Sequence, residues 1–150
     1  MAAQNKPTKI TETERKTVAG SELTQKLGIN ADEIAWRKEY TGFTDEDASR
    51  LVAISDIFEA IADELVEEFY QHLQAYDETI AILNSSSKPI QALKRNQRQY
   101  LTELTQGQYD QEYFDRRARI GKIHDMLNLG PKIYFGAYIV YYQGMIDALA

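Results

Sequence analysis

Apolar residues recur along much of the chain at steps of three and four positions, which is the spacing of one face of an α-helix. The clearest run extends from Leu51 to Leu73 and predicts either one long amphipathic helix or two helices that meet near Ser55 to Phe58. No segment alternates apolar and polar residues as a half-buried strand does, and no internal repeat is visible. The pattern therefore predicts an all-α protein.

Capping residues, glycines and prolines divide the chain further. Asn30 and Thr44 are each followed three positions later by an acidic residue, Glu33 and Asp47, which is the pattern of a capping box at a helix start. Residues 84–88 are polar and predict a loop. The further helices expected from these signals are Ser21 to Gly28, one that begins at Asn30, one capped by Asp77 through Leu83, Pro89 to about Gln106, Asp110 to about Asn128, and Ile133 to Ala150.

The composition is typical of one globular domain, since 43% of the 150 residues are hydrophobic and 27% are charged. There is no cysteine, which excludes disulfides and thiolate metal sites and favours a reducing, cytoplasmic setting. Residues 1–20 are polar and lack the apolar core of a signal peptide, so we expect a flexible N-terminal arm ahead of one domain over residues 21–150. The most apolar stretch, residues 133–146, is shorter than the ~20 residues that span a bilayer, so no membrane span is expected.

Charge is distributed unevenly along the chain. The net charge of -6 disfavours nucleic acid as a partner, because contacts to phosphates need clustered cations. Residues 81–122 nevertheless carry eight cations against four anions. Such a segment either holds an acidic ligand, for example a carboxylate or a phosphate, or forms a solvated helix face. The sequence leaves both interpretations open.

One of the two histidines projects from an apolar helix face. Ile120, Gly121, His124 and Leu127 fall on a single stripe, and Gly121 leaves a hollow beside the imidazole. A neutral imidazole with flat space in front of it is what an axial haem ligand needs. A core histidine that is held by a hydrogen bond is the alternative, and the spacing does not decide between them.

Tyr70 is the second candidate for chemistry, because its hydroxyl needs a partner if the ring is buried. In a haem pocket this hydroxyl would donate a hydrogen bond to the gas ligand, whereas the alternative is a tyrosine with its tip in water. His72 lies about 200° around the same helix at 100° per residue, so we expect it to be peripheral.

Motifs of common enzyme classes are missing from the sequence. There is no glycine-rich phosphate loop, no HExxH metal motif and no serine elbow. Glu64, Glu67 and Glu68 lack the partner helices of a carboxylate di-metal site. We therefore do not expect an enzyme.

The stretch RARIGKIHDMLNLGPKIYFGAY, Arg117 to Tyr138, closely resembles the proximal segment of globin-coupled sensors, in particular the haem-based aerotaxis transducers. The resemblance extends to DEIAWRKEYTG, to FYQHL and to the helix after Pro89, and it covers nearly all of residues 21–150. It implies a globin fold around haem b (iron protoporphyrin IX), with an extra N-terminal helical leader and no D helix. The final helix of the family has no counterpart here, so the globin domain is expected to be incomplete at its C-terminal end.

The same resemblance implies roles for individual residues. His124 would be the proximal ligand of the haem iron, and Tyr70 the distal residue that contacts the bound gas. Asn96 falls where aerotaxis members can have a small hydroxyl residue, so either Tyr70 or Asn96 could dominate ligand binding. Tyr134 matches a tyrosine associated with signal transmission, and Ile133 replaces a tryptophan often found beside it. The residues expected around the haem are Phe69, Leu73, Leu83, Leu93, Ile120, Leu127, Leu129, Ile133, Tyr134 and Ala137.

The function that the resemblance implies is a haem-based gas sensor domain, in which reversible binding of oxygen or another diatomic gas is coupled to an output such as aerotaxis. Expected partners are a second copy of the chain in a homodimer of the complete protein, and a downstream signalling module or chemotaxis kinase complex. The alternative is a haem-free, globin-like helical interaction module, and the joint presence of Tyr70, Gly121 and His124 argues against it. A gas-consuming haem enzyme would need a site for an electron donor, which we do not find in the sequence.

Overall fold

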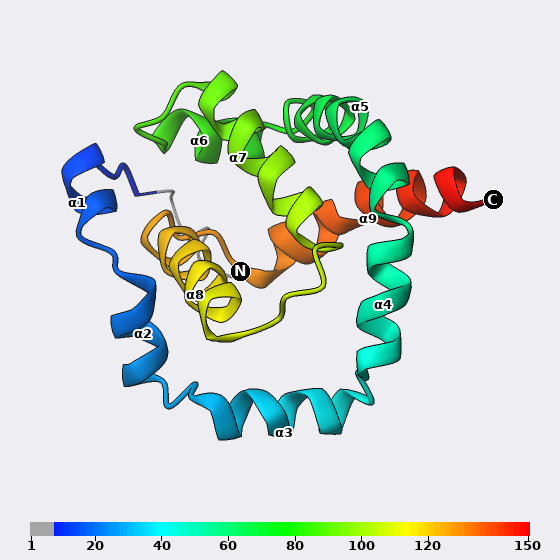
Figure 1. Ribbon diagram of the computed structural model, residues 1–150. Helices are drawn as coiled ribbons and strands as arrows, with labels where there is room; N and C mark the ends of the chain where they lie inside the picture. Colours follow the sequence, from blue (N-terminus) through cyan, green and yellow to red (C-terminus); the bar gives the residue numbers. More distant parts are fainter. Residues whose placement is uncertain (1–7) are drawn as a thin grey trace.

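Residues 8–150 are described by the computed structural model, and Figure 1 shows them as helices joined by short connections. No strand occurs among these residues, so the all-α prediction is confirmed. No helix within residues 8–150 is long and apolar enough to cross a bilayer. The helices are α1 (Glu12–Lys16), α2 (Gly20–Lys26), α3 (Ala31–Thr41), α4 (Asp45–Ala53), α5 (Ser55–Leu73), α6 (Asp77–Ser85), α7 (Ile90–Glu103), α8 (Gln111–Met126) and α9 (Pro131–Leu149).

The core lies where α5 packs against α7 and α9. Leu65, Val66 and Tyr70 of α5 cluster there with Leu101 of α7 and Tyr141 of α9, and all five side chains are buried. The three α5 residues are one and four positions apart, so they form the apolar stripe that the sequence indicated. Because this stripe is fixed between two helices, the residues beside it on α5 have defined positions.

The long apolar run consists of two helices, which was one of the two alternatives. α4 ends at Ala53 and α5 begins at Ser55, with Ile54 between them. The predicted capping box at the start of α4 is confirmed. Thr44 Oγ1 accepts a hydrogen bond from the Asp47 backbone N–H at 3.2 Å, and Asp47 Oδ2 accepts one from the Thr44 N–H at 2.9 Å.

Of the two other predicted caps, that of Asn30 is confirmed without its reciprocal half, and that of Asp77 is wrong. Asn30 accepts a hydrogen bond from the Glu33 N–H at 3.0 Å, but the Asn30 N–H donates to the carbonyl of Gly28 at 3.1 Å, so the Glu33 side chain does not complete a capping box. Asp77 is the first residue of α6 and not its cap, because Tyr76 occupies that position without a side-chain hydrogen bond. α9 also begins at Pro131, two residues before the predicted start.

The stretch predicted to be a flexible arm contains a helix. Its residues 1–7 lie outside the described part of the chain. α1 begins with a capping box centred on Thr11, and Ile10 just before it is 4% exposed and packs against Ile123 and Leu127. A helix of five residues is too short to produce a clear apolar period, which is why the sequence did not reveal it.

α2 lies directly against α8. A Cβ atom on Gly20 would stand 2.0 Å from the carbonyl oxygen of Asp115, so only glycine fits at this crossing. One turn later, the Thr24 hydroxyl donates to Asp115 Oδ1 at 2.5 Å. Figure 1 shows α2, α3 and α4 running around the outside of the molecule from α8 to α5, and α2 and α3 correspond to the predicted N-terminal helical leader. Residues 86–89, which connect α6 to α7, contain no helix, as expected for a globin fold without a D helix.

Candidate functional site

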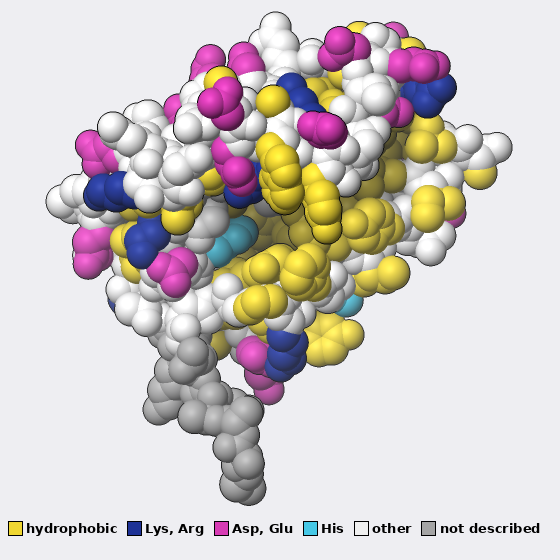
Figure 2. Space-filling view, turned by 90° about the horizontal axis from the view of Figure 1, so that it is seen from below, with side chains coloured by type: hydrophobic (Ala, Val, Ile, Leu, Met, Phe, Trp, Pro, Cys, Tyr) yellow, Lys and Arg dark blue, Asp and Glu magenta, His cyan; other side chains and the backbone are white. Residues whose placement is uncertain are grey.

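A cavity of about 1000 Å³ lies between α5, α6, α7, α8 and α9, with α1 at one side. This volume is at the upper end of the range typical of cofactor sites. Figure 2 shows the hollow, which has hydrophobic side chains along its wall and a histidine inside. The structure brings together around it every residue that the sequence placed near a haem, namely Phe69, Tyr70, Leu73, Leu83, Leu93, Asn96, Ile120, His124, Leu127, Leu129, Ile133, Tyr134 and Ala137.

His124 lies in the last turn of α8 and faces this cavity. Burial lowers the pKa of its imidazole, and the positive charge of Arg15 lowers it further, so the neutral form with a free lone pair is favoured. The His124 side chain has no hydrogen bond with any residue in 8–150, and such a bond is what a purely structural core histidine would need. A Cβ on Gly121 would meet nothing within 4 Å, so there is open space beside the imidazole.

Tyr70 lines the cavity from α5 and is 5% exposed. Burial raises the pKa of its hydroxyl to about 12, so the group stays protonated and able to donate at neutral pH. The hydroxyl has no hydrogen-bond partner within the described part of the chain. The ring is held edge-on by Phe69, at 5.5 Å between centroids, and Phe69 in turn stacks on Tyr141 at 4.6 Å.

The other predicted polar residues differ in their positions. Asn96 lines the cavity from α7, but this residue is exposed. Tyr134 and Ile133 line it from the first turn of α9, so they lie next to the segment that follows His124. His72 does not line the cavity, and its ring packs against that of Tyr76 at 5.3 Å.

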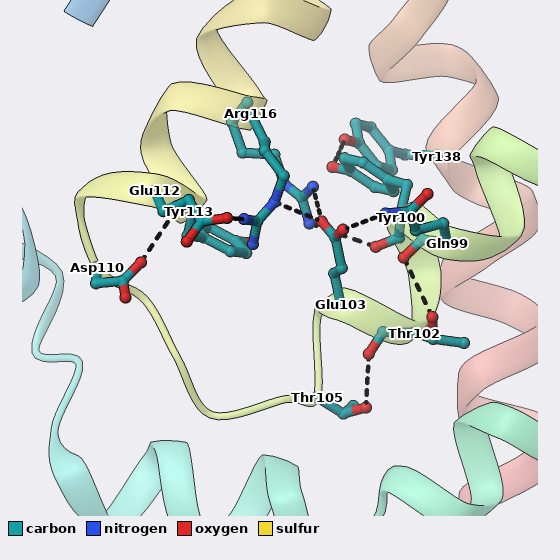
Figure 3. A network of polar contacts seen from close by, with 11 residues as sticks. Gln99, Tyr100, Thr102, Glu103, Thr105, Asp110, Glu112, Tyr113, Arg116 and Tyr138 are labelled. Carbon is teal, nitrogen blue, oxygen red and sulfur yellow. Dashed lines mark hydrogen bonds and ion pairs between the residues drawn. The ribbon is translucent and has the colours of Figure 1, made fainter. Parts of the chain in front are cut away.

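A buried carboxylate, Glu103, connects α7 with α8 (Figure 3). Glu103 is 7% exposed, and its Oε2 accepts hydrogen bonds from Arg117 Nη1 at 2.9 Å and Arg116 Nε at 3.3 Å. Its other oxygen accepts a hydrogen bond from Gln99 Nε2 at 2.9 Å. Because both carboxylate oxygens are used, the buried charge is compensated and the helix that carries His124 is fixed to α7.

The same cluster ties α7 to α9. The Arg117 guanidinium lies 4.1 Å from the ring centroid of Tyr100 and 4.4 Å from that of Tyr113. The hydroxyls of Tyr100 and Tyr138 are 2.9 Å apart and hydrogen-bonded (Figure 3). Burial and this bond raise the pKa of Tyr100, so the hydroxyl remains protonated. The last turn of α7 is therefore connected to both α8 and α9, and the three helices form one wall of the cavity.

The basic segment over residues 81–122 fits both interpretations that the sequence left open. Lys94 forms an ion pair with Glu67 at 2.5 Å, and Arg98 forms ion pairs with two further carboxylates of α5, so these cations belong to a solvated helix face. Lys88 and Arg119 instead line the cavity, where an acidic group would meet them.

Tyr141 and Arg15 are among the cavity residues that sequence reasoning missed. Tyr141 is 2% exposed, and it follows Tyr134 and Ala137 on the same face of α9, so helical spacing would have revealed it. Arg15 lines the cavity from α1, but it reaches this place through contacts with residues more than 70 positions away, which no local pattern reports.

The arrangement suits a flat, apolar group whose metal takes one nitrogen ligand. Most of the wall is apolar, and a neutral imidazole faces the cavity from one side with a protonated hydroxyl elsewhere on the wall. In the described part of the chain, no three histidine, aspartate or glutamate side chains gather as ligands for a bare metal ion. The residues present therefore fit haem as the group that would bring its own metal.

Comparison with known proteins agrees with this geometry. The Protoglobin family model matches residues 30–150. Over 143 residues, the chain is 46% identical to the haem-based aerotactic transducer HemAT of Halobacterium salinarum. The matched region is 95% of this chain but only 29% of the transducer, so the chain spans less than a third of that relative.

Proposed function

This chain belongs to the protoglobin family, and on that premise we propose that it is a haem-based gas sensor domain that binds haem b in the cavity and oxygen, or another diatomic gas, reversibly at ferrous iron. The observation that carries the proposal is the neutral imidazole of His124, which has no hydrogen bond with the described residues and faces a largely apolar cavity. The similar transducer is named as haem-based, which supports the same function.

The chain's own residues have distinct roles in this proposal. His124 supplies the axial nitrogen, Gly121 leaves room for the ring, and apolar side chains such as Leu93 and Leu127 exclude water from it. When bound, ferrous haem supplies an open coordination position that takes oxygen, carbon monoxide or nitric oxide.

Tyr70 is the residue that we assign to the gas ligand. Its buried, protonated hydroxyl has no partner among residues 8–150, so it can donate a hydrogen bond to a polar ligand without breaking another bond. We do not assign Asn96 to the gas ligand, because this residue is exposed and its amide can hydrogen-bond to water instead.

The output is proposed to pass through α9, since Tyr134 lines the cavity while another face of the same helix is exposed. Five apolar residues on that face alternate at steps of four and three, which is the seam of a coiled coil. We infer that a second copy of the chain packs on this seam in a homodimer of the complete protein, which then acts on a signalling module or chemotaxis kinase complex. The seam residues are Phe135, Ile139, Tyr142, Ile146 and Leu149.

The proposal describes a binding domain and not an enzyme, and it places the domain in the cytoplasm, a setting that suits a chain without cysteine. The haem-free interaction module, which the sequence left as the alternative, gives no role to the cavity or to the exposed lone pair of His124. That alternative is therefore not favoured.

Replacing the proposed iron ligand tests this function. We expect His124→Ala to reduce the amount of haem retained after reconstitution and gel filtration by at least about tenfold, because the iron loses its protein ligand. His72→Ala is the matched control and should retain haem like the unchanged chain, since His72 does not line the cavity. Equal haem retention and an unchanged absorption spectrum in His124→Ala would reject the assignment.

A further inference from the structure

A buried cation whose ion pair within residues 8–150 is long and half exposed stands at the edge of the cavity. Arg15 is 5% exposed and lines the cavity from α1. Its Nη2 donates to Ser86 Oγ at 3.2 Å and its Nε to Ser87 Oγ at 3.4 Å, so its hydrogen-bond partners are neutral hydroxyls. The carboxylate of Glu12 is 4.0 Å away and its side chain is half exposed. A guanidinium in such a place is short of negative charge, because burial has removed its water.

The electrostatics around Arg15 also favour a negatively charged ligand. Burial lowers the pKa of the guanidinium, Glu12 opposes this effect, and the positive charge of Arg119 adds to it. Arg119 donates to the backbone carbonyls of Val18 and Arg15, at 3.0 and 3.3 Å, and so holds α1 beside α8. The site therefore keeps two guanidinium groups together at the cavity wall.

A second cation lies in the same corner. Lys88 follows the two serines that hold Arg15, and it lines the same cavity. Its ammonium group has no hydrogen bond or ion pair with the residues that the structure describes. By contrast, Lys94 and Arg117 both have carboxylate partners within 3 Å.

We propose that Arg15 and Lys88 form a subsite for the two propionate carboxylates of haem, so that α1 closes over the edge of the cofactor. The inference rests on the proposed function. Haem b carries two carboxylates on one edge. This corner offers Arg15, whose ion pair with Glu12 is 4.0 Å long, and Lys88, whose ammonium group has no carboxylate partner among residues 8–150. The planar fork of Arg15 can hold a carboxylate with two parallel hydrogen bonds, while Lys88 acts as a point charge.

The subsite makes the order of α1 depend on the cofactor. α1 contacts the segment between α6 and α7 through Arg15, and residues 8 and 10 donate backbone hydrogen bonds to Leu127 and Ser85. Pairing Arg15 with a carboxylate offsets part of the cost of burying it, so haem binding stabilises this closed position. Amide hydrogen exchange over residues 8–19 should therefore slow when haem is added.

The test compares haem with its dimethyl ester, in which both carboxylates are blocked. Rates of haem loss to a high-affinity scavenger are measured for the unchanged chain, Arg15→Gln, Lys88→Gln and the control Arg37→Gln, an exposed residue of α3. We expect Arg15→Gln to speed the loss of haem about tenfold or more, and Lys88→Gln to speed it by a smaller factor. Neither substitution should change the loss of the dimethyl ester, and Arg37→Gln should change neither rate.

The outcomes separate this inference from the proposed function. If the unchanged chain binds haem but Arg15→Gln and Lys88→Gln leave its loss unchanged, or accelerate the loss of haem and of the ester equally, the subsite is wrong and the sensor function stands. If the unchanged chain binds neither porphyrin, the proposed function fails and the subsite with it. If Arg15→Gln loses helical circular dichroism, two other measurements test the subsite. These are the rate of haem loss from Lys88→Gln and the effect of haem on amide hydrogen exchange over residues 8–19, and no change in either would reject it.

Discussion

Burial sets the protonation of the two side chains on which the site depends. It lowers the pKa of His124 and raises that of Tyr70 to about 12, so at neutral pH one offers a lone pair and the other an O–H donor. Neither group has a competing hydrogen bond with residues 8–150. The proposed haem site would therefore have a metal ligand and a hydrogen-bond donor in the protonation states that gas binding requires.

The hydroxyl of Tyr70 can be removed with almost no change of shape. Tyr70→Phe should speed oxygen dissociation by roughly tenfold to 150-fold, the range that corresponds to one charge-assisted hydrogen bond of about 1.5 to 3 kcal/mol. Asn96→Ala is the comparison and should have a clearly smaller effect, because that amide is exposed. Stopped-flow measurement of oxygen release gives both rates, and an equal or larger effect of Asn96→Ala would contradict the assignment.

Single residues were predictable where a local pattern marked them. His124 stood out as an imidazole on an apolar stripe, and the resemblance to sensor globins pointed to Tyr70. Arg15 was hidden, since its burial depends on Ser86, Ser87 and Arg119, which lie far away in the chain. Its position follows from tertiary packing and leaves no trace in the residues around it.

Close helix contacts position the elements around the cavity. α5 is fixed between α7 and α9, and the Glu103 cluster fixes α8 to α7. On its other side α8 is held by α2, where Gly20 allows the backbones to approach. The position of His124 thus depends on contacts on both sides of α8.

The contact at Gly20 can be disrupted by one methyl group. Gly20→Ala should lower the free energy of unfolding by about 1–3 kcal/mol, because the new Cβ would overlap the carbonyl of Asp115. Gly136→Ala is the matched control: nothing lies within 4 Å of a Cβ there, so helix propensity should raise stability by about 0.5–1 kcal/mol. Urea denaturation followed by circular dichroism measures both, and a neutral Gly20→Ala would show that α2 is not tightly packed.

Apolar periodicity predicted the longer helices well, because each buries one stripe. The starts of α4 and α6 differ in how well the sequence marked them. Thr44 has both halves of a capping box and does cap α4. Asp77 had only a suitable side chain, and α6 begins at this residue with Tyr76 as its cap. The short helix α1 had no period to detect. Contacts such as that between Gly20 and Asp115 were beyond any local pattern.

At the scale of the whole molecule, α9 connects the cavity to the protein surface, because one of its faces lines the cavity and another is exposed. Ala137 and Tyr141 are buried, while Phe135 and Ile139 are exposed by 67% and 59%. An apolar surface of this length on a monomer is typical of an interaction site. In the proposed dimer, a change at the cofactor would reach the partner subunit through this one helix.

A charge placed on this seam tests the proposed dimer. Ile139→Glu should raise the dimer dissociation constant at least about 100-fold, because an unpaired carboxylate would be buried between subunits. Leu27→Glu is the control: Leu27 is 67% exposed but lies away from α9 at the end of α2, and its replacement should leave association unchanged. Sedimentation velocity over a concentration series measures both dissociation constants. Equal constants for the two variants would show that the seam is not the dimer interface.

The most direct test of the account is the absorption spectrum of the purified chain, reconstituted with haem b, reduced, and exposed in turn to oxygen and to carbon monoxide. We predict a sharp Soret band that shifts with each gas and returns when the gas is removed, because His124 leaves one coordination position of the iron open. A chain that holds no haem, or a Soret band that neither gas shifts, would contradict the central claim that this cavity is a gas-sensing haem site.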